Sequence, residues 1–83
     1  MSEKQTEIEI VEELDATGMF CPEPLLEVRE LSDTVKIGQC FKVLADDPEA
    51  EKDLKDWAEE TGVEIIDFTK NGDLLTFTFR KRS

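Results

Sequence analysis

The first change from strand to helix in this chain is encoded by the stretch Leu14-Asp15-Ala16-Thr17-Gly18-Met19-Phe20-Cys21-Pro22-Glu23-Pro24. Glycine permits a tight turn, and Gly18 follows the last residues of the expected strand. Proline is favoured in the first helical turn, because the N–H group that it lacks has no partner there. The stretch therefore predicts a strand that ends near Asp15 and a helix that begins at Pro22, with Cys21 at the mouth of the helix.

This position makes Cys21 the first candidate for a functional residue. A thiolate at a helix N-terminus is stabilised by the positive end of the helix dipole, by roughly 0.3–2 kcal/mol. The carboxylates of Glu23 and Glu27 oppose thiolate formation by a similar amount. We therefore expect a modestly perturbed thiol whose reactivity increases when a basic partner docks. The alternative from this motif alone is a structural cysteine beside an ordinary helix start.

Hydrophobic periodicity predicts the elements on either side of this stretch. Before it, Ile8, Ile10 and Leu14 keep one parity, which predicts a strand over residues 8–15 with a polar opposite face. After it, an apolar stripe predicts a helix over residues 22–33.

A second strand and a second helix follow. Phe41, Val43 and Ala45 share one face of a strand expected over residues 39–45. Asp47-Pro48 then predicts a helix start, with Asp as the N-cap and Pro at the first helical position. Gly62 supplies a left-handed C-cap. Between them lies an amphipathic stripe at helical spacing: Ala50, Leu54, Trp57, Ala58 and Thr61.

The last twenty or so residues predict a β-hairpin. Asn71-Gly72 lies between two apolar-rich runs, which is a strong signal for a two-residue hairpin loop. With this loop, strand pairing gives Lys70 opposite Asp73, Phe68 opposite Leu75 and Ile66 opposite Phe77, with Phe79 continuing the same face.

The expected fold class is an α+β two-layer sandwich with the element order βαβαββ. Right-handed crossovers that step in one direction put both helices on one face of the sheet. The last strand then inserts antiparallel, giving the order 1-2-4-3. The whole chain, 1–83, is expected to be one domain with residues 1–6 disordered. Parity predicts the residues of the uncovered face: Cys40, Lys42, Leu44, Ile65, Thr76, Thr78 and Arg80.

The segment Gly18-Met19-Phe20-Cys21-Pro22-Glu23-Pro24 resembles the hallmark of the TusA/SirA-like sulfur-carrier family, Gly-Leu-x-Cys-Pro-x-Pro. The runs Phe41-Lys42-Val43-Leu44-Ala45 and Asp46-Asp47-Pro48 also resemble that family, so the likeness covers nearly the whole chain. It implies the same two-layer fold. It also implies that Cys21 carries the sulfur and that Gly18, Pro22, Glu23 and Pro24 position it.

The resemblance implies persulfide transfer between a sulfur-donor protein and a downstream acceptor protein, with no cofactor. The relay would serve tRNA thiolation, cofactor biosynthesis or sulfur oxidation, and the sequence does not choose among them. One alternative is a noncatalytic adaptor or regulatory protein that docks a partner through its acidic surface. Another is a redox protein that cycles between Cys21 and Cys40, although Cys40 is expected to be a small filler residue.

Composition narrows the classes of function. The chain has 83 residues, 21 acidic and 10 basic, and no histidine. Cys–His catalysis within the chain is therefore excluded, and no ligand cluster for zinc or an iron–sulfur centre is expected. The formal charge of −11 disfavours direct binding of nucleic acid. It favours a partner with a basic docking surface, or else reflects solubility or adaptation to a salty cytosol.

No apolar run is long enough to span a membrane, and Met1-Ser2-Glu3-Lys4 does not resemble a signal peptide. We therefore expect a cytoplasmic protein, and we expect it to be a monomer.

Overall fold

The computed structural model describes residues 10–20 and 23–82. The expectation for residues 1–6 lies outside this part of the chain. The elements occur in the predicted order. They are β1 (Ile10–Asp15), α1 (Glu23–Thr34), β2 (Cys40–Ala45), α2 (Pro48–Thr61), β3 (Glu64–Asn71) and β4 (Leu74–Arg80). The four-stranded sheet has the order β1-β2-β4-β3. β1 and β2 are parallel, and β4 is antiparallel to both of its neighbours.

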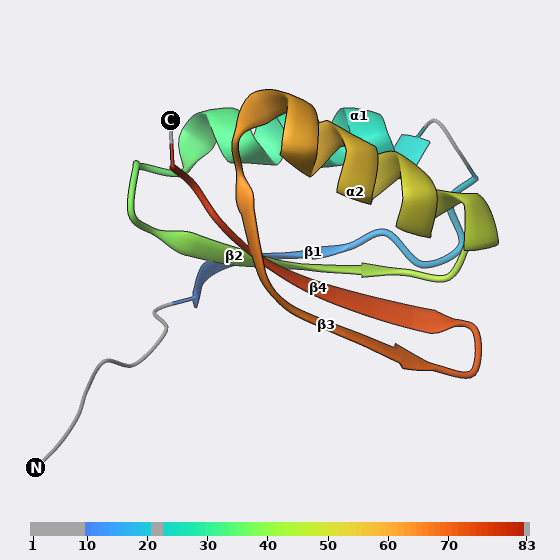
Figure 1. The fold of residues 1–83 in the computed structure, drawn as a ribbon. Helices are drawn as coiled ribbons and strands as arrows, with labels where there is room; N and C mark the ends of the chain where they lie inside the picture. Colours follow the sequence, from blue (N-terminus) through green and yellow to red (C-terminus); the bar gives the residue numbers. More distant parts are fainter. Residues whose placement is uncertain (1–9, 21–22, 83) are drawn as a thin grey trace, which may run out of the picture.

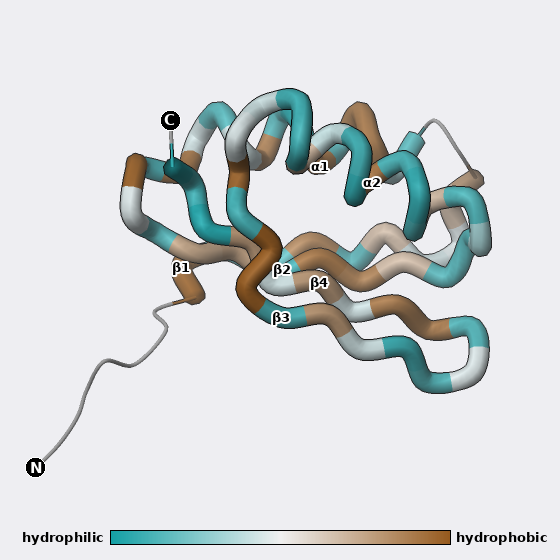
Figure 2. The backbone as a smooth tube through the Cα atoms, in the orientation of Figure 1, coloured by the Kyte–Doolittle hydropathy of each residue, from teal (hydrophilic) through white to brown (hydrophobic). Residues whose placement is uncertain are grey.

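Both helices cover the same face of the sheet (Figure 1), which confirms the predicted two-layer sandwich. The hydrophobic core lies between the layers. Phe41, Phe77 and Phe79 are fully buried. The ring of Trp57 on α2 meets Phe79 edge-on, with centroids 5.6 Å apart. Figure 2 shows hydrophobic stretches in β2, in β4 and at the start of β3, and a hydrophilic hairpin tip.

The local signals for α2 are confirmed. The Asp47 carboxylate accepts a hydrogen bond from the Glu49 N–H at 3.0 Å, and Pro48 follows the cap. At the other end Gly62 adopts φ 81°, and its N–H donates to the carbonyl of Ala58. Four members of the predicted stripe are buried, namely Ala50, Leu54, Trp57 and Ala58, whereas Thr61 in the last turn is exposed.

The predicted parity of the first strand is wrong at Ile10, which is 41% exposed. Val11 and Leu14 pack against the core instead. The pairing of β1 with β2 is irregular between Ile10 and Glu12. Such a bulge adds one residue to a strand and shifts its alternation by one position. Ile8 lies outside the described residues.

The hairpin forms, but its predicted register is wrong by two residues in the partner strand. Asn71 pairs with Leu74 and Phe68 with Phe77, so the loop is Gly72-Asp73. Gly72 has φ 63°. The two-residue loops favoured in hairpins, types I′ and II′, both require a positive φ at the first central residue, and this register puts the glycine there. A shift of two keeps every side chain on its predicted face, so Phe77 and Phe79 still enter the core.

One residue of the predicted uncovered face is also wrong. β3 is irregular between Ile65 and Asp67, and Ile65 pairs with Phe79 and packs against the core. The bulge reverses the alternation at the start of β3. The cross-strand pairs of the other predicted members are Cys40 with Arg80, Lys42 with Thr78 and Leu44 with Thr76, which keeps them on one face. Cys40 is nevertheless only 2% exposed.

Candidate functional site

Two loops meet at the end of the molecule where β1 and β2 finish. Because these strands are parallel, their carboxyl ends lie at one edge of the sheet, and the β1–α1 and β2–α2 connections leave from the same end (Figure 1). The Gly18 N–H donates to Asp46 Oδ1 at 2.9 Å across this edge. The Ala16 N–H donates to the carbonyl of Leu44 at 2.8 Å. These bonds fasten the β1–α1 connection to the end of β2.

Residues 15–19, at the start of the β1–α1 connection, are held by local hydrogen bonds. The Asp15 carboxylate accepts hydrogen bonds from the N–H of Thr17, at 3.0 Å, and from its hydroxyl. The Thr17 hydroxyl and then its N–H lower the pKa of Asp15, because both bonds favour the ionised carboxylate. The Met19 N–H donates to the carbonyl of Ala16, which is fully buried. Residues 15–19 thus form a hydrogen-bonded turn after β1.

Gly18 is required by backbone conformation and not by space. Its φ is 83°, and a Cβ atom built there would meet no atom within 4 Å. Residues with a side chain pay a steric cost at such angles. The turn that the sequence predicts at Gly18 is therefore confirmed.

The other predicted site residues divide into two groups. Cys21 and Pro22 lie outside the described residues. Glu23 and Pro24 form the first turn of α1, where Glu23 is exposed and Pro24 is buried. The Glu23 N–H donates to the carbonyl of Phe20 at 2.9 Å. This bond joins Phe20 to the first residue of α1.

The sequence pattern predicts no role for Asp46, the first residue of the run Asp46-Asp47-Pro48. Only one of two consecutive aspartates can be the N-cap of α2, and Asp47 is that residue. The sequence signal for a role of Asp46 is that it is a second aspartate, which does not cap α2. In the structure Asp46 holds Gly18, which lies 28 positions away in the sequence.

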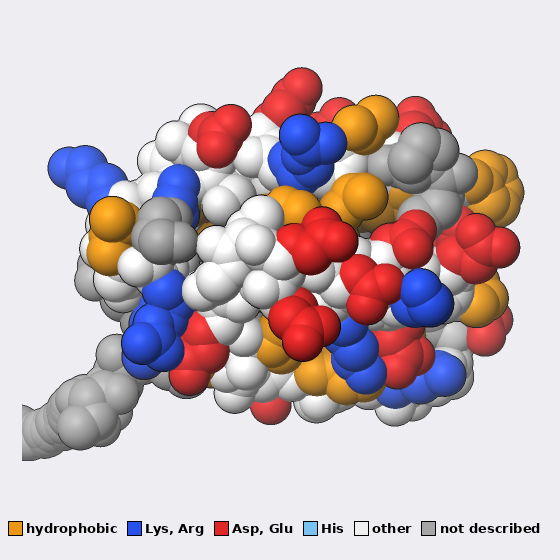
Figure 3. Space-filling view, turned by 45° about the horizontal axis from the view of Figure 1, so that its top comes forward, with side chains coloured by type: hydrophobic (Ala, Val, Ile, Leu, Met, Phe, Trp, Pro, Cys, Tyr) orange, Lys and Arg blue, Asp and Glu red, His pale blue; other side chains and the backbone are white. Residues whose placement is uncertain are grey.

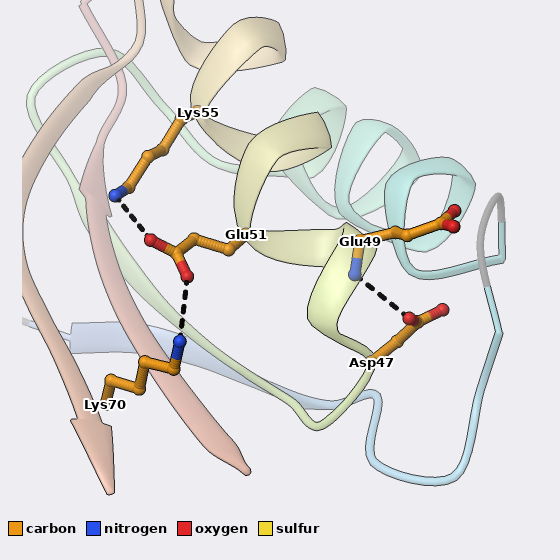
Figure 4. Close-up of polar contacts among 5 residues, drawn as sticks. All are labelled: Asp47, Glu49, Glu51, Lys55 and Lys70. Carbon is orange, nitrogen blue, oxygen red and sulfur yellow. Dashed lines mark hydrogen bonds and ion pairs between the residues drawn. The ribbon is translucent and has the colours of Figure 1, made fainter. Parts of the chain in front are cut away.

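Two carboxylates near the start of α2 have different partners (Figure 4). At the start, the Asp47 carboxylate accepts a backbone N–H. Further along, Glu51 contacts two lysines, with Lys55 Nζ at 2.9 Å and Lys70 Nζ at 3.6 Å. Lys55 and Lys70 lower the pKa of Glu51. These contacts tie α2 to the β3–β4 hairpin.

The end of the molecule that holds the β1–α1 and β2–α2 connections, which we call the loop end, carries negative charge. The segments 5–28 and 43–51 contain no lysine or arginine. Their acidic residues include Asp15, Glu23, Glu27, Asp46 and Glu49. Figure 3 shows acidic side chains over the helix layer, with hydrophobic ones between them. A thiolate near these groups is disfavoured by like charge unless a cation approaches.

Two further kinds of site, a membrane-spanning helix and a metal site, are absent from residues 10–20 and 23–82. Neither helix there combines the length and the hydropathy that a membrane crossing requires. Within the same ranges, no three His, Cys, Asp or Glu side chains gather as a metal ion would need.

Comparison with known proteins gives one consistent family. The family model described as Sulfurtransferase TusA matches residues 12–81. The sulfur carrier protein TusA of Allochromatium vinosum is 34% identical over 70 residues, which are 84% of this chain and 92% of that protein. A protein of the same name from Pseudomonas syringae is 30% identical over 83 residues, which cover 100% of this chain and 99% of the relative.

A solved structure supports the fold. The crystal structure of a SirA-like protein from Desulfitobacterium hafniense matches with a TM-score of 0.76. The match covers 88% of this chain and 100% of that one, at 21% sequence identity. With the family model spanning most of the described residues, the resemblance noted in the sequence is confirmed, and the chain belongs to the sulfurtransferase TusA family.

Proposed function

We propose that this protein is a sulfur carrier that accepts a sulfur atom as a persulfide on Cys21 and passes it on. The observation that carries the proposal is the family match over residues 12–81, which includes Cys21 between the β1–α1 turn and α1. Relatives of nearly full length bear the name sulfur carrier protein.

The proposed reaction is a thiol–persulfide exchange. The Cys21 thiolate attacks the outer sulfur of a donor persulfide, and a bond forms between Cys21 Sγ and that sulfur. The S–S bond of the donor breaks, and the donor cysteine leaves as a thiolate with the bonding electron pair. The proton of the transferred S–H stays on the transferred sulfur. No external oxidant or reductant is consumed, and the reverse step delivers the sulfur to an acceptor thiol.

The residues around Cys21 are proposed to position it. Gly18 and Asp46 fasten the approach to the end of β2, through the bond of 2.9 Å between them. Pro22, Glu23 and Pro24 set the direction of the backbone where α1 begins. A rigid approach lowers the entropy cost of bringing the two sulfur atoms into line.

Cys40 has no part in this proposal, because it is 2% exposed and a protein-bound donor cannot reach it. Burial of this thiol also disfavours a redox cycle between Cys21 and Cys40. We propose that the partners are a donor protein and an acceptor protein, without direct contact to nucleic acid and without a cofactor. The proposed relay serves tRNA thiolation, cofactor biosynthesis or sulfur oxidation in the cytoplasm. We also propose that the chain is one domain and that the protein is a monomer.

Sulfur loading tests the proposal directly. Reduced protein is incubated with inorganic polysulfide, desalted, and analysed by intact-mass and peptide mass spectrometry. The wild type and Cys40→Ala should gain the mass of one sulfur atom, located on Cys21. Cys21→Ser should gain none. Loading that persists in Cys21→Ser, or a wild type that never loads, would refute the carrier role and favour the noncatalytic adaptor.

A further inference from the structure

The largest exposed apolar side chain close to the β1–α1 turn is Phe20. Its exposed fraction is 76%, and that of Leu26 on α1 is 48%. The other four phenylalanines, Phe41, Phe68, Phe77 and Phe79, are buried or partly buried. Phe20 therefore contributes little to the core of this domain, and its ring is available to another molecule.

Phe20 and Leu26 both lie at the N-terminal end of α1. The hydrogen bond from the Glu23 N–H to the Phe20 carbonyl, at 2.9 Å, keeps these two Cα atoms within about 7 Å. Leu26 follows three residues later, about 4.5 Å further along the axis of α1. We name Phe20 and Leu26 together the apolar patch. It lies at the N-terminal end of α1.

The apolar patch is bordered by carboxylates. Glu23 and Glu27 belong to the first turns of α1, and Glu49 to the first turn of α2. Asp46, which is bonded to Gly18, brings the β2–α2 connection beside them. Lysine and arginine are absent from the segments 5–28 and 43–51, but Arg29 lies one turn beyond Leu26 on α1 and lines a pocket with it, so the surroundings of the patch carry more negative than positive charge.

The opposite end of the layers has a different surface. There the Gly38 N–H donates to the carbonyl of Lys81 at 2.7 Å, which brings the α1–β2 connection beside the end of β4. These two segments contain the basic residues Lys36, Lys81 and Arg82. They also contain Ile37, which is 68% exposed. Ile37 thus provides a matched apolar residue in a basic setting.

We propose that Phe20 and Leu26 anchor the sulfur-donor protein, through an apolar pocket on the donor that is rimmed by lysine or arginine. This inference rests on the proposed function and adds the chemistry of the partner. An aromatic anchor buried in a pocket and surrounded by a polar rim is the usual composition of an interface hot spot. The basic rim would also bring a cation toward the Cys21 thiolate, which the neighbouring carboxylates of Glu23 and Glu27 disfavour.

The two parts of the surface have separable effects. The carboxylates attract a basic donor over a distance, so they act on the association rate and are screened by salt. The apolar patch acts after encounter, so its loss acts on the dissociation rate. A variant of the patch should keep the salt dependence of association, whereas a variant of the carboxylates should reduce it.

The test compares sulfur loading from protein donors with loading from a small donor. The protein donors are a rhodanese loaded with thiosulfate and a cysteine desulfurase supplied with cysteine, and the small donor is inorganic polysulfide. Phe20→Ser should lower kcat/KM for the protein donor by roughly 10- to 100-fold. Leu26→Ser should lower it by roughly 3- to 10-fold, because the side chain is smaller and less exposed. Polysulfide should load both variants at the wild-type rate.

Two controls complete the design. Ile37→Ser removes a similarly exposed apolar side chain at the other end and should leave both rates unchanged. The double variant Glu27→Gln/Glu49→Gln should flatten the salt dependence with the protein donor, and Phe20→Ser should not.

An unchanged rate in Phe20→Ser, an equal loss in Ile37→Ser, or a wild type that loads from polysulfide and from neither enzyme would overturn this docking surface. Failure of Cys21 to load from polysulfide would instead refute the proposed function itself, so the two failures are distinguishable.

Discussion

Carboxylates at the loop end of the molecule and carboxylates on the side of α2 that faces the β3–β4 hairpin have different partners. On the hairpin side, Glu51 contacts Lys55 and Lys70, and Lys55 Nζ lies 4.4 Å from the centre of the Phe68 ring. At the loop end, the carboxylates of Asp15, Asp46 and Asp47 accept backbone N–H groups. A cation cancels the charge of a carboxylate, whereas an N–H group holds the carboxylate in place and leaves its charge.

This one acidic chain therefore uses its carboxylates in two ways. Paired carboxylates join α2 to the hairpin and contribute little net potential. Carboxylates bound by backbone groups shape the turn before α1 and keep their negative charge. Both arrangements use the same residue types, and the neighbouring elements decide which one results.

The largest effect is expected for Gly18→Ala. Its φ of 83° is unfavourable for a residue with a Cβ atom, so the free energy of unfolding should fall by about 1–2 kcal/mol. Gly72→Ala in the hairpin is the matched control, because it too has positive φ and no atom within 4 Å of a built Cβ. Urea denaturation should show similar losses. Only Gly18→Ala should slow sulfur loading of Cys21, and equal slowing in both would remove the functional distinction between the two regions.

A smaller effect is expected for Asp46→Ala. It leaves the Gly18 N–H without the acceptor at 2.9 Å and should lower the free energy of unfolding by about 1 kcal/mol. Asp46→Asn keeps an acceptor oxygen and removes the charge, so it should retain most of that stability. Chemical denaturation of both variants checks this, and equal losses would show that charge rather than the hydrogen bond matters at Asp46.

At the hairpin side, Glu51→Gln should cause a small loss of stability that disappears at high salt, because its ion pairs with Lys55 and Lys70 are exposed. Thermal unfolding at low and high salt measures it. The salt dependence of association with a donor enzyme should remain that of the wild type. A change there would mean that Glu51 also contributes to the docking surface.

The smallest effect concerns acid titration of Asp15. Hydrogen bonds from Thr17 lower its pKa below the ordinary value of 3.8, so they stabilise the fold above that pH and are lost as the pH falls through the lowered value. Thr17→Val removes the hydroxyl and should move the Asp15 midpoint upward, toward 3.8. Carboxyl NMR titration reports this midpoint directly. An unmoved midpoint would contradict the assigned cause.

Several features of this protein were determined by local sequence alone. Asp47-Pro48 marks the start of α2 and Gly62 marks its end, because capping depends on a few adjacent residues. Alternation in β2 and helical spacing in α2 identified most of the core, and the element order predicted the strand order 1-2-4-3. Gly18 marked the turn, since a positive φ is a local requirement.

Other features were decided by tertiary structure. The bulge that brings Ile65 into the core, and the two-residue shift in the hairpin, depend on how whole strands fit together, and alternation alone does not report an extra residue. The bond from Gly18 to Asp46 joins residues 28 positions apart. It exists because β1 and β2 are parallel and end at one edge, which no short segment encodes. Local backbone preferences therefore determined the elements, and packing between elements determined the register and the contacts of the loop end.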